Sequence, residues 1–260
     1  MKKRVLMVVC GVLAVALVCF LGFAALIALS PDEAEEVGPV AETTNVLGEE
    51  APLVTLDVGV AESAEGALVF DVTPQEIIDS FNGYYWQDKG ERYFRPLTAW
   101  RQEAVENTVM LNQPQTQYVY TADESVWTLP QVNVYVPEGE SRVAQIALTY
   151  DEHSYSEATY ALFEEDCFYM LKTFFPDLSD EKLTSLYKTV NQLGYDHTFP
   201  STEQYRPGMA KLPVALYYRD GIGIFSYFAI GAPFHFCVVP VDEALVASYA
   251  AGGVEVVEIA

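Results

Sequence analysis

Residues 132–150 read VNVYVPEGESRVAQIALTY and contain the clearest strand signal of the chain. Valine alternates with other residues from Val132 to Val136, which is the period of a β-strand with one buried face. The next four residues, 137–140, are Pro-Glu-Gly-Glu, a typical turn composition. The chain then returns through a second apolar stretch from Val143 to Tyr150. The stretch predicts two antiparallel strands joined by a short turn.

Further strands are predicted on both sides of this hairpin. Asp220-Gly221 is a two-residue hairpin signal between two runs rich in β-branched and aromatic residues. Gly231-Ala232-Pro233 marks another turn, after which apolar residues continue. These further strands are predicted at 118–121, 125–129, 214–219, 222–230 and 234–239.

Three helices are predicted from capping signals. Thr73 and Glu76 form a capping box around Pro74, and this helix is predicted to end at Gly83. A second box begins at Ser154 and opens a longer helix that Pro176 stops. A third helix has Ser179 as its cap and Gly194 at its end. The last two helices are joined by few residues and are predicted to pair antiparallel.

The order of these elements predicts the fold class. A helix is followed by strands, then by two helices, then by strands again. This order is typical of an α+β domain, here with an antiparallel sheet and all helices packed on one face.

The first thirty residues predict a membrane anchor. Met1–Arg4 carries three positive charges, and 5–29 contains no charged residue. A helix of that length exceeds the ~30 Å of a bilayer core, whereas a cleaved signal needs only about 7–15 apolar residues. Cys19 lacks a small residue before it, and the apolar run continues beyond it, so we do not expect a lipid there. Cleavage after Ser30 remains the alternative.

The domain organisation follows from composition. Residues 1–30 are predicted to be a signal-anchor with the N-terminus cytoplasmic. Residues 31–66 are rich in Gly, Pro and acidic residues and lack Lys and Arg, which is typical of a flexible linker, although 53–58 is a possible strand. The extracytoplasmic domain is predicted at 67–260.

The charge of the chain excludes one class of partner. The formal net charge is −23, and because three basic residues precede Asp32, the rest of the chain carries −26. Such a surface repels nucleic acids and anionic headgroups. We therefore expect no nucleic-acid partner. The predicted partners are the membrane, through residues 5–29, and an envelope glycan or protein.

Two cysteines, Cys167 and Cys237, lie in the outer domain. They are interpreted either as a disulfide or as two buried free thiols. His235 shares one strand face with Cys237, so a weak zinc constellation with Cys167 is conceivable. A buried histidine in a packed strand is the simpler interpretation, and we expect no metal. Gly221-Ile222-Gly223 lacks the rest of a phosphate or dinucleotide loop, so no cofactor is expected.

Aromatic residues give the only indication of a binding site. They are Tyr84, Tyr85, Trp86, Tyr93 and Trp100, and they follow the expected end of the first helix. A loop there would present rings to a glycan or peptide ligand. The alternative is that these rings form ordinary core over the sheet.

The sequence carries no catalytic motif. No serine lies in a Gly-x-Ser-x-Gly elbow, and the acidic run Glu164-Glu165-Asp166 is typical of a solvated helix surface. We therefore expect a membrane-tethered extracytoplasmic binding or adaptor domain. The alternative function is a cell-envelope hydrolase that acts on glycan or peptide through carboxylates that the sequence does not identify.

Residues 70–82 read FDVTPQEIIDSFN. With the anchor and the acidic linker, this phrase resembles a loose group of extracytoplasmic proteins of Gram-positive gut bacteria. Many of these begin their domain with a similar helix after a lipoprotein signal or membrane anchor. The resemblance implies an extracytoplasmic location and a similar architecture, and it brings no activity with it.

Overall fold

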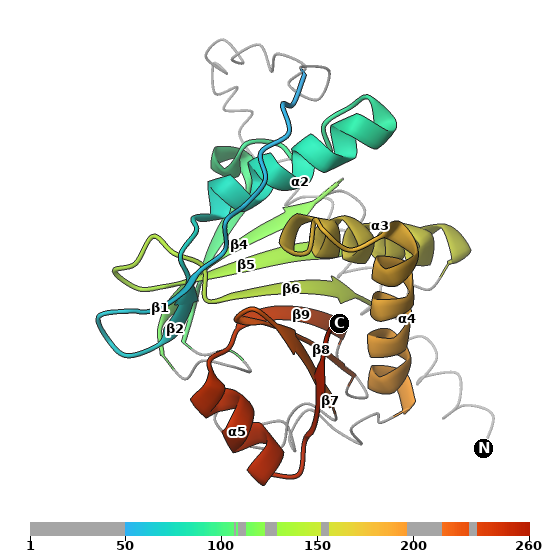
Figure 1. Ribbon diagram of the computed structural model, residues 1–260. Helices are drawn as coiled ribbons and strands as arrows, with labels where there is room; N and C mark the ends of the chain where they lie inside the picture. The colour runs from blue at the N-terminus through green and yellow to red at the C-terminus, as the bar shows by residue number, and fades with distance from the viewer. Residues whose placement is uncertain are drawn as a thin grey trace, which may run out of the picture. The chain divides into compact units, whose positions relative to one another are not determined.

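The computed structural model describes residues 50–106, 108, 113–122, 129–151, 156–196, 215–228 and 233–260 (Figure 1). These residues belong to one compact unit. The predicted anchor at 5–29 and most of the predicted linker lie outside them. In the ranges just given, no helix has both the length and the apolar character needed to cross a membrane.

The described elements alternate between groups of strands and groups of helices. The strands are β1 (Val60–Glu62), β2 (Leu68–Phe70), β3 (Arg101–Val105), β4 (Gln115–Thr121), β5 (Gln131–Pro137), β6 (Gln145–Tyr150), β7 (Ala215–Arg219), β8 (Ile222–Tyr227), β9 (Phe234–Pro240) and β10 (Glu255–Glu258). The helices are α2 (Pro74–Lys89), α3 (Glu157–Phe174), α4 (Asp180–Asp196) and α5 (Glu243–Ala251), with a short 3₁₀ turn, η2, at Leu97–Ala99.

The main sheet has eight strands in the order β10-β7-β8-β9-β6-β5-β4-β3. The predicted hairpins β5–β6 and β7–β8 are confirmed, with Val134 opposite Ile146 and Tyr217 opposite Ile224. The prediction of a purely antiparallel sheet is wrong, because β10 pairs parallel to β7. The chain leaves β9, forms α5 and returns at the sheet edge beside β7, and such a crossover gives a parallel pair.

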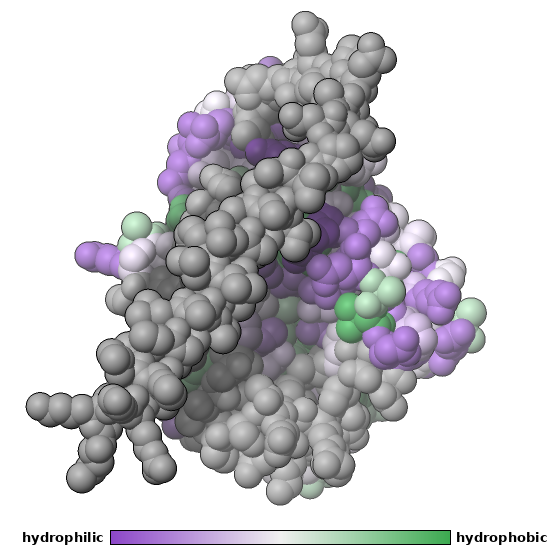
Figure 2. Space-filling view, turned by 180° about the vertical axis from the view of Figure 1, so that it is seen from behind, coloured by the Kyte–Doolittle hydropathy of each residue, from purple (hydrophilic) through white to green (hydrophobic). Residues whose placement is uncertain are grey.

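The sheet has a core on each face. On the first face, α2, α3 and α4 cover a large cluster that includes Phe81, Phe163 and Phe236. On the second face, α5 packs on a smaller cluster around Phe225 and Cys237. The α+β class is therefore confirmed, but the helices are not confined to one face. Figure 2 shows hydrophilic side chains over much of the described surface that is in view, as the acidic composition leads one to expect.

Helix α2 begins as predicted and ends later than predicted. Thr73 caps it, and its capping box with Glu76 is complete. The helix passes through Gly83 and ends at Gly90, which has a left-handed φ of 75°. A Cβ at Gly83 would lie 2.8 Å from the Cα of Leu53 and 2.9 Å from the oxygen of Pro52. The glycine thus allows the 50–58 segment to cross the helix closely, and it is not a stop signal.

The next two helices also differ from prediction in detail. The N-cap of α3 is Ser156, whose box partner is Thr159, and not Ser154, which lies outside the described residues. Pro176 follows the C-cap of α3, as predicted. Helix α4 continues through Gly194, where a Cβ would collide with Ser226 and the ring of Phe234. Figure 1 shows α4 running across the direction of α3, because α4 packs on the strands; the predicted antiparallel pair is not formed.

Residues 50–66 are part of the folded domain. The amide of Asp71 donates to the oxygen of Gly59 at 2.8 Å, and β1 pairs antiparallel with β2. Partly buried apolar residues of this segment, Leu56, Val58 and Val60, pack against the main core. The domain therefore extends to Glu50 at least, and the predicted boundary at Ala67 is too late. The possible strand at 53–58 is not a strand in the structure.

Candidate functional site

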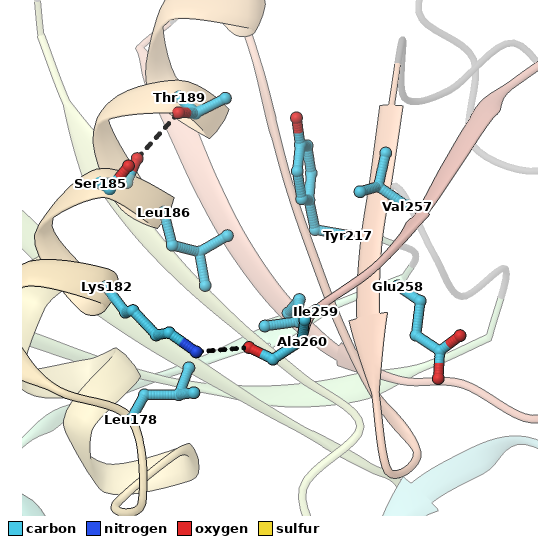
Figure 3. Close-up of a pocket in the computed structure, with 10 residues that line it drawn as sticks. All are labelled: Leu178, Lys182, Ser185, Leu186, Thr189, Tyr217, Val257, Glu258, Ile259 and Ala260. Atoms are coloured by element: carbon cyan, nitrogen blue, oxygen red, sulfur yellow. Dashed lines mark hydrogen bonds between the residues drawn. The ribbon is translucent and has the colours of Figure 1, made fainter.

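An open groove of about 310 Å³ lies between helix α4 and the β7–β10 end of the sheet (Figure 3). Its apolar walls come from Leu178 and Leu186 on the helix side and from Tyr217, Val257 and Ile259 on the sheet side. Small-molecule sites typically have volumes of ~300–1,000 Å³, so the groove lies at the lower end of that range. The complete lining is Leu178, Lys182, Ser185, Leu186, Thr189, Tyr217, Val257, Glu258, Ile259 and Ala260.

The local sequence explains how the groove forms. Helix α4 places Lys182, Ser185, Leu186 and Thr189 on one side at spacings of three and four residues, and Leu178 lies just before the helix. The parallel strand β10 then brings the last residues of the sequence alongside this helix face. Because β10 occupies the sheet edge, the space between it and α4 is open to solvent rather than filled by another strand.

One end of the groove holds the ammonium group of Lys182. The Nζ atom of Lys182 donates to the main-chain oxygen of Ala260 at 3.2 Å, and an ammonium group has three N–H donors. In Figure 3 the carboxylate of Glu258 points away from the α4 side of the groove. The hydroxyl of Thr189 donates to the oxygen of Ser185 within the helix at 2.8 Å. The groove therefore combines apolar walls with one cationic group.

The lining contains few of the groups that catalyse bond cleavage. Ser185 has no histidine beside it among the lining residues, and Glu258 is the single lining residue with a carboxylate side chain. Hydrolysis of a glycan normally needs two carboxyl groups that face each other. The groove offers an apolar surface for an apolar group and the ammonium of Lys182 for an acidic one.

The aromatic residues predicted to bind a ligand lie elsewhere and are mostly buried. Tyr84, Tyr85 and Trp100 expose at most 7% of their surface, and Trp86 and Tyr93 are partly buried. Tyr85 stacks on Phe81 and Tyr93 packs on it with a tilted ring, and Trp100 joins them through Phe94 and Tyr120. Tyr84, Tyr85 and Trp86 belong to α2 and not to a loop. Tyr84, Tyr85 and Trp100 belong to the main core and Tyr93 packs against it, which is the second interpretation that the sequence allowed; Trp86 is only partly buried.

A single amide positions this aromatic cluster. The side-chain oxygen of Asn82 accepts from the amides of Tyr93, at 3.0 Å, and Phe94, at 2.8 Å. Its side-chain nitrogen donates to the oxygen of Phe94 at 3.0 Å. Asn82 lies on α2 and is buried, so its side chain fixes the chain after the helix and thereby the rings of Tyr93 and Phe94.

Asp166 behaves differently from its neighbours in the acidic run 164–166. Its carboxyl group is only 1% exposed, whereas Glu164 and Glu165 remain partly exposed and Glu165 pairs with Lys89. Burial raises the pKa of Asp166 to about 7, and a hydrogen bond from the hydroxyl of Tyr93 opposes this shift. The prediction that this run is solvated helix surface therefore does not hold for Asp166.

The two cysteines are free and lie in different cores. Cys167 belongs to the core under α2–α4 and Cys237 to the core under α5, so the sheet separates their thiols and the possible disulfide is not formed. The conceivable zinc constellation is not formed either, because Cys167 is on the opposite face from Cys237 and His235. His235 instead stacks on Tyr227 at 4.4 Å, and burial lowers its pKa to about 4. His153 and His197 lie outside the described residues.

Comparisons with family models, with curated proteins and with solved structures found no match to this chain. The residues of the groove were not identified from the sequence. Helical spacing on α4 was visible there, and Tyr217 lies on the strand predicted at 214–219. The other sheet-side residues, 257–260, lie on or just after β10, a strand that the sequence pattern did not predict. Nothing in the chain order alone places β10 beside α4.

Proposed function

We propose that this protein is a membrane-tethered extracytoplasmic binding protein and that the α4–β10 groove is its ligand site. The observation that carries the proposal is the combination of apolar walls with Lys182 at one end. The predicted ligand is a small amphiphile, with an apolar body in the groove and an acidic group beside the ammonium. Charge complementarity of this kind fixes the orientation of a ligand more than it raises its affinity.

The binding prediction can be measured with a fluorescent fatty-acid analogue. Dansyl-labelled undecanoic acid should bind the full chain saturably, with increased fluorescence. Lys182→Gln should weaken binding of the acid by about 2- to 5-fold, which is the range of an exposed ion pair, and leave its methyl ester unaffected. Leu186→Glu should weaken both, because it introduces a charge into the apolar wall.

The matched control is Lys188→Gln, on the same helix but outside the groove lining. It removes the same charge from the chain, so a general electrostatic effect would appear in both lysine variants. Equal binding of acid and ester by wild type and by Lys182→Gln would argue against the acidic group. Binding that Leu186→Glu leaves unchanged would place the ligand elsewhere and contradict the proposed site.

The tether is the second part of the proposal, and it rests on the apolar run 5–29. In cells that produce the full chain, the protein should remain in the membrane fraction after a high-salt wash, and its N-terminus should be Met1 or Lys2. External protease should remove the domain from intact cells whose wall has been digested. Protein in the medium that begins at Pro31 would show that the segment is a cleaved signal.

The binding proposal is preferred to a hydrolase because of where the carboxylates lie. The groove has one carboxylate side chain in its lining, and Asp166, whose pKa is near neutrality, is buried within the α2–α3 layer. A general acid must reach the substrate proton directly or through one water. Asp166 at 1% exposure does not offer such access in this structure.

A further inference from the structure

The carboxyl group of Asp166 occupies an unusual place between two layers of the domain. It projects from α3 into the aromatic cluster beneath α2, where its Oδ1 atom has no hydrogen-bond partner. The hydroxyl of Tyr93 donates a hydrogen bond to this carboxyl group. A buried carboxylate with so few partners is costly to keep ionised.

The titratable groups that act on Asp166 are neutral or negative. Tyr85 faces it from α2, Tyr93 from the segment between α2 and η2, and Tyr120 from β4. On α3 itself, Glu165 raises the pKa of Asp166, and Cys167 is a buried thiol whose own pKa is raised. Around these groups, Lys89 pairs with Glu165, and Arg95 lowers the pKa of Tyr120.

The sign of the resulting pH dependence follows from these surroundings. The pKa of Asp166 is about 7 in the folded chain, against an ordinary value of 3.8. Between these two pH values the folded chain retains a proton that the unfolded chain has lost. Stability is therefore greatest at the acidic end of this window and falls as the pH rises, and the loss is complete above the folded pKa.

We propose that Asp166 is a proton-controlled latch that seats α3 against α2 and the Tyr93 segment. With the carboxyl protonated, the two layers pack as in the structure. With it ionised, the buried charge favours separation of α3 from α2, or entry of water between them. This device goes beyond the proposed ligand site and does not depend on it, since α3 contributes no residue to the groove lining.

The latch can be tested on the full chain in detergent micelles by urea unfolding from pH 5 to pH 8.5. Trp86 and Trp100 lie in or beside the aromatic cluster and report its unfolding by fluorescence. The unfolding equilibrium constant of wild type should rise on the order of 100-fold between pH 5 and pH 8 relative to Asp166→Asn. Dividing the unfolding equilibrium constant of wild type by that of Asp166→Asn at each pH removes the pH dependence that comes from the overall negative charge.

Two further variants sharpen the test. Glu165→Gln removes the adjacent acid and should keep most of the pH dependence of wild type, because Glu165 is partly exposed. Tyr93→Phe removes the hydrogen bond that stabilises the ionised carboxyl, so the pH midpoint should move upward. This second variant also serves if Asp166→Asn does not fold. Parallel pH profiles for wild type and Asp166→Asn, or an unmoved midpoint in Tyr93→Phe, would overturn the latch.

Discussion

Replacing Asn82 with alanine is expected to lower the free energy of unfolding by about 3–5 kcal/mol. The substitution removes the oxygen and the nitrogen of the side-chain amide. It leaves three main-chain groups without their partner: the amides of Tyr93 and Phe94 and the oxygen of Phe94. Each buried polar group left unpaired costs about 1–3 kcal/mol, and partial relaxation of the segment reduces the sum. Urea unfolding monitored by tryptophan fluorescence measures the change.

Gln75→Ala is the matched control for Asn82→Ala. It also removes one side-chain amide from α2, but the oxygen of Gln75 accepts a single, partly exposed bond from the amide of Leu97 at 3.2 Å. Its expected cost is about 1 kcal/mol or less. A loss for Asn82→Ala no larger than that of Gln75→Ala would mean that the segment after α2 does not depend on this side chain.

Phe81→Ala is expected to cost a similar amount, about 3–5 kcal/mol, through a different mechanism. The Phe81 side chain is fully buried, and its ring packs against those of Tyr85, Tyr93, Phe94 and Tyr169. Alanine would remove this ring from the centre of the cluster and leave a cavity that its aromatic neighbours fill poorly. Urea titration at a fixed pH gives the change in unfolding free energy.

Phe168→Ala supplies the comparison for this cavity. Phe168 contacts Tyr169 edge-to-face but remains partly exposed on α3. Its truncation should cost about 1–2 kcal/mol, because less apolar area leaves water and solvent can fill the space. Equal costs for the two phenylalanines would show that the cluster is solvated, which would reopen its interpretation as a ligand platform.

The local chemistry of the sequence was sufficient for features that depend on a few adjacent residues. The capping box at Thr73 and Glu76, the stop at Pro176 and the two strongest hairpins are correct because each is decided by backbone geometry and hydrogen bonds within a few positions. The α+β class follows from the order of those elements. The apolar run 5–29 still predicts an anchor, since only length and hydrophobicity enter that argument.

Glycines show where local reasoning fails. Gly83 and Gly194 were predicted to end helices, because glycine is common after a last turn. Both lie inside helices, at places where another segment of the chain approaches too closely for a Cβ. The approaching residues, Leu53 for the first glycine and Ser226 and Phe234 for the second, are about thirty positions or more away in sequence. No local pattern contains that information.

Tertiary structure also decided which polar and aromatic residues are exposed. Glu164, Glu165 and Asp166 are equivalent as a run of acids, but the rotation of α3 directs only Asp166 into the core. Tyr85 and Trp100 are suitable for a ligand platform by composition. Tyr85 is core because α2 extends more than one turn beyond Gly83, and Trp100 is core because it packs on Phe94 and Tyr120. The groove arises when β10 joins the sheet edge beside α4, a pairing between residues about forty positions apart. The sequence by itself determined caps, turns and apolar runs, because those are set by neighbours along the chain; burial, the latch and the groove depend on which distant segments meet.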